Sequence, residues 1–216
     1  HPGGSHYYIH AIEGSDHPEK GLTVAKQLPE LMPGVAHLVH MPSHIYIRAG
    51  YYNEGVIVNE RAVKGYYQTL GNYAPVINNS VLYLVHNLHM QATCANMDGR
   101  FMDALKASKD CAESFDSSYM DLGGYLGAYV QYIYMTPFLT LIRFGKWDQI
   151  LNSPEIPASR VYANLIWHYG RGLAYARRKD FDRADEQLEF MRQAMKVDQL
   201  LESPPAFNPA IAGSKV

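Results

Sequence analysis

Apolar residues recur at helical spacing along most of the chain, and one recurring turn phrase separates the helices that they predict. The phrase is a turn residue, then an aromatic that opens the next helix, then a residue, usually small, three positions later. Its copies are Gly50-Tyr51-Tyr52 with Gly55, Gly99-Arg100-Phe101 with Ala104, Gly145-Lys146-Trp147 with Ile150, Lys179-Asp180-Phe181 with Ala184, and a fainter Asp16-His17-Pro18 with Gly21. The pattern predicts about five helix–turn–helix units and no strands.

This phrase resembles the unit of the tetratricopeptide (TPR) repeat family, in which a turn aromatic follows helix A and small residues follow in helix B. If that aromatic is numbered 17 in each unit, Pro18, Tyr52, Phe101, Trp147 and Phe181 align, with spacings of 34, 49, 46 and 34 residues. The family period is typically about 34, so two units carry insertions, expected at residues 71–79 and 114–124. The resemblance implies an all-α, TPR-like α-solenoid over residues 1–202 with two irregular repeats, followed by an irregular tail at 203–216.

Composition and charge exclude several functional classes. Of 216 residues, 47% are hydrophobic and 19% charged, which predicts a folded chain. The formal net charge is −2 and Lys and Arg form no run, so neither nucleic acid nor a membrane surface is an expected partner. No stretch of 18 apolar residues predicts a membrane span, so we expect a soluble protein, cytoplasmic or periplasmic. Because the chain begins with His1, we expect it to be a piece of a longer protein.

Seven of the ten histidines fall in register when the units are aligned on the turn aromatic. They occupy positions 2, 5 and 9 of helices A, which lie on one face because residues three and four apart are neighbours on a helix. The seven are His37 and His86 at position 2, His6, His40 and His89 at position 5, and His10 and His44 at position 9. In the TPR family this face lines the concave groove, so the resemblance implies a wall of imidazoles.

The register predicts a metal site. Two histidines at i,i+4 can chelate one ion, and the chain has two such pairs, His6/His10 and His40/His44. His89 is a further predicted ligand, and Glu13, one turn beyond His10, is predicted to coordinate or to orient an imidazole. Imidazole nitrogens suit zinc, copper or nickel. By contrast, His168 is expected to be a packed core residue and His17 a solvated one.

The competing interpretation is a polar and aromatic groove that recognises a peptide, a partner protein or a small ligand. Its predicted residues are His37, His86, Tyr7, Tyr46 and Arg48. The TPR clamp for acidic chaperone tails has Lys at position 5 and Asn at position 9, whereas this chain has His at both, which argues against that ligand. The sequence therefore leaves two hypotheses open: a binding module, with or without a bound metal, and a metal-dependent enzyme of the hydrolytic or copper redox class.

Two segments also resemble those of a group of bacterial TPR-containing proteins. One follows the pattern HPGxxHxxIHA from His1 to Ala11, and the other follows HxxHMPSHIxxR from His37 to Arg48. Both segments contain predicted ligands. The resemblance supports a site in these stretches and supplies no mechanism, and the oligomeric state stays open.

Overall fold

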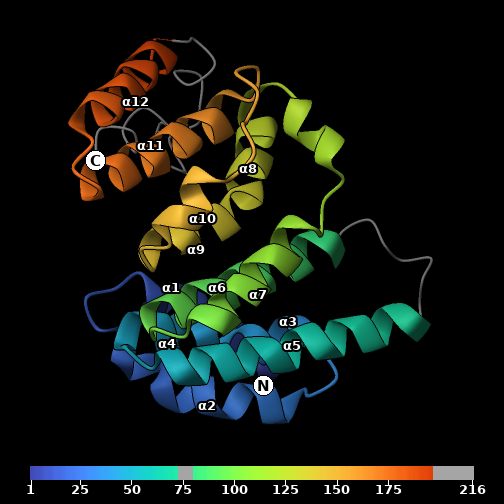
Figure 1. Ribbon diagram of the computed structural model, residues 1–216. Helices are drawn as coiled ribbons and strands as arrows, with labels where there is room; N and C mark the ends of the chain where they lie inside the picture. The colour runs from blue at the N-terminus through green and yellow to red at the C-terminus, as the bar shows by residue number, and fades with distance from the viewer. Residues whose placement is uncertain (73–79, 197–216) are drawn as a thin grey trace. The chain divides into compact units, whose positions relative to one another are not determined.

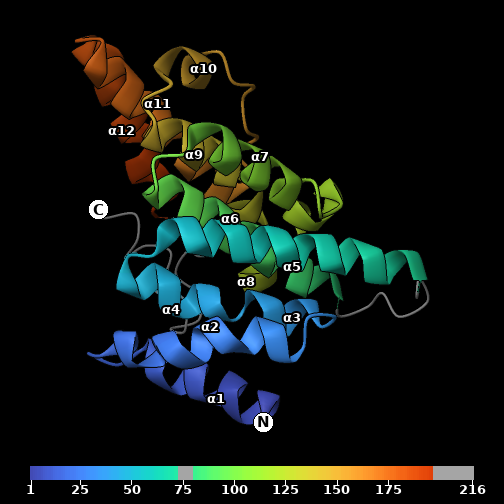
Figure 2. The ribbon, with the colours of Figure 1, turned by 90° about the horizontal axis from the view of Figure 1, so that it is seen from below.

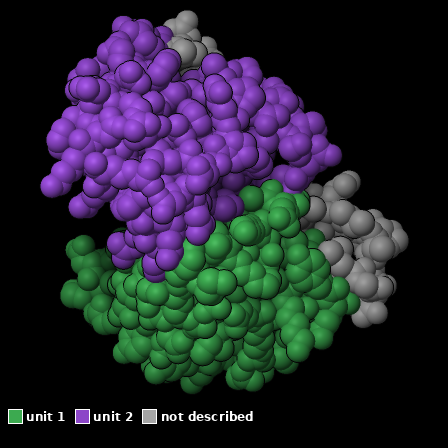
Figure 3. Space-filling view, in the orientation of Figure 1, with its two compact units in different colours: residues 1–114 green, residues 115–216 purple. Residues whose placement is uncertain are grey.

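The protein is all-helical in the residues that the computed structural model describes, which are 1–72 and 80–196 (Figure 1). The chain divides into two compact units, residues 1–114 and 115–216 (Figure 3). The sequence predicted one continuous repeat domain over 1–202. The predicted tail at 203–216 and most of the predicted insertion at 71–79 lie outside the described residues. No helix in the described ranges is long and apolar enough to cross a membrane.

Unit 1 consists of helices that pack mainly on their neighbours in the chain. Its elements are α1 (Pro2–Glu13), the 3-10 helix η1 (Pro18–Gly21), α2 (Leu22–Leu31), α3 (Ala36–His40), α4 (Pro42–Ala49), α5 (Tyr52–Asn72), α6 (Ser80–Met97) and α7 (Phe101–Ala112). Helix α1 packs on α2 and α4, α4 on α5, α5 on α6, and α6 on α7. Figure 2 shows α1, α4 and α5 as successive layers.

The recurring turn phrase begins a helix at every predicted place. Helices α5 and α7 start at the turn aromatics Tyr52 and Phe101. Two residues earlier in each case, Gly50 and Gly99 have φ values of 82° and 76°. Glycine adopts this left-handed conformation without the steric cost of a Cβ, so it ends one helix and redirects the chain into the next. The predicted helix boundaries are confirmed here because this signal is local.

The small residues after the turn aromatics allow close helix packing. A Cβ added to Gly55 on α5 would lie 2.5 Å from Cys94 Sγ on α6. A Cβ on Gly21 would lie 2.8 Å from Ile45 Cδ1 on α4. Ile45 belongs to the buried core of unit 1 together with Ile9 and Leu28. Larger residues at either glycine would push apart the helices that position the site described below.

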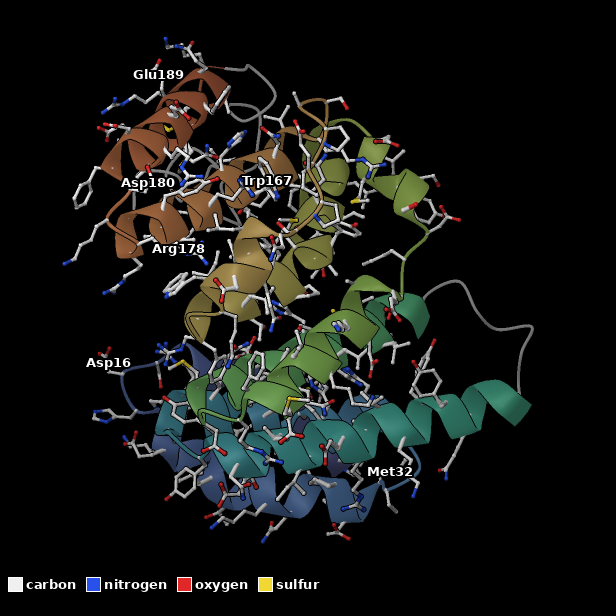
Figure 4. All side chains as sticks on the ribbon, viewed as in Figure 1. Asp16, Met32, Trp167, Arg178, Asp180 and Glu189 are labelled. Carbon is white, nitrogen blue, oxygen red and sulfur yellow. The ribbon has the colours of Figure 1, made fainter. Side chains whose placement is uncertain are left out.

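Unit 2 is built in the same way around its own apolar core. Its elements are the 3-10 helix η3 (Ser117–Asp121), α8 (Gly124–Tyr134), α9 (Thr136–Arg143), α10 (Trp147–Leu151), α11 (Val161–Arg177) and α12 (Phe181–Ala194). The core contains Phe138, Ile150 and Trp167, the last of which lies on α11 (Figure 4). Gly170 lets α11 approach α9 closely, since a Cβ there would meet the Phe138 ring at 2.4 Å.

Candidate metal centre

Three helical segments of unit 1 supply one compact group of imidazoles. We call this group the histidine cluster. Its members are His6 and His10 on α1, His37 and His40 on α3, His44 on α4, and His86 on α6. Helix α1 packs on α4, and α3 packs on both α5 and α6, so the three sources meet in one place.

The interruption between α3 and α4 keeps their three histidines on one face. Pro42 has no backbone N–H and cannot continue the helical ladder. Met41 nevertheless stays right-handed, with φ −49° and ψ −36°, and the N–H of His44 donates to the Met41 carbonyl at 3.2 Å. The chain therefore continues in nearly the same direction, and the spacings from His37 to His40 to His44 still act as helical spacings.

The imidazoles of the cluster contact one another directly. Five of them form a closed ring in the order His6, His10, His44, His40, His37 and back to His6, with neighbouring ring centroids 4.9 to 5.2 Å apart. The sixth, His86, lies 4.7 Å from His40 and 5.4 Å from His44. These side chains form one packed cluster and are not spread along an open surface.

Glu13 joins two histidines from different helices. Its Oε1 accepts from His10 Nδ1 at 2.8 Å, and its Oε2 accepts from His44 Nδ1 at 2.6 Å. A carboxylate only accepts hydrogen bonds, so both imidazoles carry their proton on Nδ1 and keep a lone pair on Nε2. Burial raises the pKa of Glu13, but hydrogen bonds from His44 and His10 outweigh it and hold that pKa at about 2.

Other ring nitrogens face each other at a spacing that suits ligands of one ion. His6 Nε2 and His37 Nε2 are 3.1 Å apart, and His44 Nε2 and His86 Nε2 are 3.4 Å apart. Two nitrogens bound to the same tetrahedral zinc, at Zn–N distances of about 2.0–2.1 Å, are separated by about 3.3 Å. Each pair also matches a single N–H···N hydrogen bond in the metal-free protein.

Two buried nitrogens in the cluster have no hydrogen-bond partner. They are Nε2 of His40, a side chain with 0% exposure, and Nδ1 of His37. The other nitrogen of His40 lies 3.5 Å from Ser43 Oγ. An unsatisfied buried polar group costs about 1–3 kcal/mol, so the cluster contains nitrogens that a further ligand would stabilise.

The surroundings keep these imidazoles neutral, which is the form that binds metal. Burial, reinforced by neighbouring imidazoles, lowers the pKa of His37 and of His86 to about 4. The same causes lower the pKa of the fully buried His40 well below its ordinary value, with Asn59 opposing them. Burial also lowers the pKa of His6, and His10 and His44 add to the effect.

Three sets of side chains in the described residues could each hold an ion, with ligand atoms within 4.8 Å of one another. They are His6, His10 and His37, which we call the outer trio, then His40, His44 and His86, which we call the inner trio, and finally His10, Glu13 and His44. Five of the six predicted ligands, all but His89, therefore meet. His37 and His86, which the sequence placed in a recognition groove, lie in the same cluster.

The remaining predicted residues lie elsewhere. His89 joins none of the three sets within the described ranges. It lies on α6 three residues after His86, which is about 4.5 Å along the axis and about 60° around it. Tyr46 is in the core of unit 1 with 7% exposure, Tyr7 is 74% exposed beside His6, and Arg48 is exposed in the last turn of α4.

One neighbour of the cluster was not predicted. The Tyr83 ring lies 4.7 Å from the His37 ring, with its centroid closer than those of most imidazole pairs. Tyr83 precedes His86 by three residues on α6, so the same spacing rule that grouped the histidines would have placed it on their face.

The comparisons with known proteins leave the geometry as the basis for function. No family model, no curated protein and no solved structure matches this chain. The arguments below therefore start from the chemistry of the described side chains.

Proposed function

We propose that unit 1 is a TPR-like module that binds transition-metal ions in the histidine cluster and recognises a peptide, partner protein or small ligand through the bound metal. The observation that carries this proposal is the closed ring of contacting imidazoles, joined by Glu13 and containing buried nitrogens without partners. A groove that recognised a peptide through separate hydrogen bonds would present these nitrogens outward, whereas here they face one another.

An inventory of donors and acceptors supports a cation. Six neutral imidazoles carry six N–H donors and six lone pairs. Glu13 accepts two of the N–H groups, from His10 and His44. Four N–H groups then remain within the cluster for six lone pairs, so acceptors exceed donors. A metal ion supplies the missing electron-pair acceptor, and imidazole with a carboxylate suits zinc, copper or nickel.

The ligand count favours an ion that keeps an exchangeable position. Each trio supplies three imidazoles, and three protein ligands on a tetrahedral ion leave the fourth position to water or another ligand. A peptide carboxylate, a side chain of a partner or a small anion could bind there. The same open position is the specific observation that favours a second candidate, metal-assisted hydrolysis or copper redox chemistry, because catalytic metal sites share it.

The proposal is tested by the metal content of tag-free protein, measured by elemental mass spectrometry after purification and after incubation with zinc, copper or nickel. A variant with His6, His10, His40 and His44 all changed to Ala removes two ligands from each trio. His17→Ala is the matched control, because His17 is a solvated histidine 63% exposed and outside the cluster. We expect tightly held metal in the wild type and the control and none in the variant. Wild-type protein that takes up none of the three metals would rule the proposal out.

A further inference from the structure

We infer that the histidine cluster is a dinuclear centre, in which the outer and inner trios each bind one ion and Glu13 links the two halves. This inference rests on the proposed function and states how many ions the site holds and how they differ.

The number and spacing of the donors exceed what one ion needs. A single zinc in a protein takes about four ligands, whereas the cluster offers six imidazoles and a carboxylate. The two close nitrogen pairs, His6/His37 and His44/His86, belong to different trios and have no residue in common. Each pair has the spacing expected around its own ion, so the geometry contains two separate coordination points.

Glu13 is placed to serve both points without being a ligand at either. One of its oxygens holds Nδ1 of His10, in the outer trio, and the other holds Nδ1 of His44, in the inner trio. Both imidazoles are thereby fixed with Nε2 available for metal, which is the carboxylate–histidine–metal arrangement found around many protein-bound ions. We therefore assign Glu13 as a positioning residue shared by two ions, and its negative charge offsets part of their mutual repulsion.

The two coordination points differ in access to solvent. In the outer trio the His10 side chain is 40% exposed, whereas in the inner trio the His44 side chain is 11% exposed and His40 is fully buried. An ion in the outer trio can exchange ligands with solvent, so it is the ion that would bind an incoming ligand. An ion in the inner trio is enclosed by α3, α4 and α6 and holds those helices together.

The test counts zinc ions bound per chain by the whole protein, by titration against a chromophoric chelator and by elemental analysis after desalting. The outer variant is His6→Ala/His10→Ala, the inner variant is His40→Ala/His44→Ala, and the control is His17→Ala. We expect two zinc ions in the wild type and control, one in each pair variant, and none when both pairs are changed. One ion in the wild type, lost in either pair variant, would establish a single shared site and overturn the inference. No ion in the wild type would instead refute the proposed function.

Two further measurements keep the result clear if the inner variant fails to fold. His86→Ala removes an inner ligand from outside α3 and α4 and should also leave one ion. Removal of zinc from the wild type by excess chelator should be biphasic, and the outer variant should lose the fast phase. A single phase from a protein with two ions would overturn the assigned difference in access.

Glu13→Gln tests the link. Glutamine has one oxygen acceptor and a donor in place of the second, so it cannot hold both Nδ1–H groups. We expect two zinc ions still to bind, each about 10–100-fold more weakly, as is typical when such a carboxylate is lost. Weakening at only one of the two sites would show that Glu13 does not join them.

Discussion

Buried histidines serve two different roles in the two units. In unit 2, His168 on α11 is 9% exposed, and its Nδ1 lies 2.8 Å from Gln187 Oε1 on α12. Its ring stacks on Phe190 with centroids 4.7 Å apart and an interplanar angle of 17°. In unit 1, His40 is fully buried, contacts three other imidazoles, and keeps an unpartnered Nε2.

The difference separates a structural histidine from a candidate ligand. A neutral amide satisfies His168 and an aromatic face covers it, so nothing more is needed to stabilise it. The imidazoles of unit 1 are surrounded by further lone-pair donors and so lack enough hydrogen-bond donors of their own. Burial alone does not distinguish the two cases, whereas the identity of the contacting groups does.

The largest effect we expect is acid destabilisation of metal-free unit 1. The pKa of His37 and of His86 is lowered to about 4, and that of His40 is lowered further by burial. The unfolded chain binds protons near pH 6.5, before the folded cluster does, so stability is full above that value and falls as pH drops toward 4. We expect a loss on the order of 2–4 kcal/mol, since one pKa unit corresponds to about 1.4 kcal/mol and solvent screening at half-exposed His37 reduces its share.

Hydrogen exchange at pH 7 and pH 5 on metal-free protein measures this effect. Protection should fall more in α1, α3 and α4 than in α11 and α12. The quadruple variant of the cluster should lose most of the pH dependence. Equal losses in both units would contradict the assignment of the effect to the cluster. Glu13 contributes only at lower pH, because its pKa of about 2 makes its stabilisation disappear as pH falls below 4.5.

Zinc should stabilise unit 1 by a comparable amount. A ligand at 100 times its dissociation constant stabilises the folded state by about 2.7 kcal/mol for each independent site. Thermal unfolding with and without zinc measures the shift, and magnesium, which prefers oxygen ligands, should cause none. The quadruple variant should show no zinc shift, and a His168→Ala variant should keep the wild-type shift. A zinc shift that depended on His168 would break the distinction between the two units.

His168→Ala should destabilise the metal-free protein by about 2–3 kcal/mol, because it leaves Gln187 unpaired in the interior and removes the stacking on Phe190. Urea denaturation measures the change. Zinc content should stay as in the wild type. A loss below about 0.5 kcal/mol would mean that the pair with Gln187 has no structural role.

His40→Leu should have the smallest effect on the metal-free protein. Replacing a buried polar group that lacks its partners by an apolar one is nearly neutral or stabilising, so we expect a change within about 1 kcal/mol. The same substitution should reduce zinc binding at the inner trio. Strong destabilisation in urea, comparable to that of His168→Ala, would show that the His40 nitrogens are satisfied in solution and that the contrast between the units is wrong.

Helix positions were predictable from the sequence because their signals are local. The turn glycines Gly50 and Gly99 and the aromatics that follow them specify where one helix ends and the next begins, whatever lies nearby. His168 as a packed core residue followed from its place on an apolar face. The pairs His6/His10 and His40/His44 followed from the helical period, which places residues four apart on one side of one helix.

Which histidines meet across helices was decided by tertiary structure. The sequence paired His89 with the other ligands by repeat position, but the way α6 packs on α3 and α5 brings His86 and Tyr83 to the cluster instead. The rotation of a helix about its own axis depends on core contacts such as those of Ile9 and Ile45, and a register of repeats cannot specify it when insertions separate the units.

The sequence by itself thus determined that the chain is helical, where most helices start, and that imidazoles line one face of several of them. Only the tertiary structure decided that six of these imidazoles close into one cluster, that Glu13 on α1 reaches His44 on α4, and that His40 is buried with a nitrogen left over. The physical reason is range: backbone conformation and helical period act over a few residues, whereas a metal site depends on distances of a few ångströms between helices.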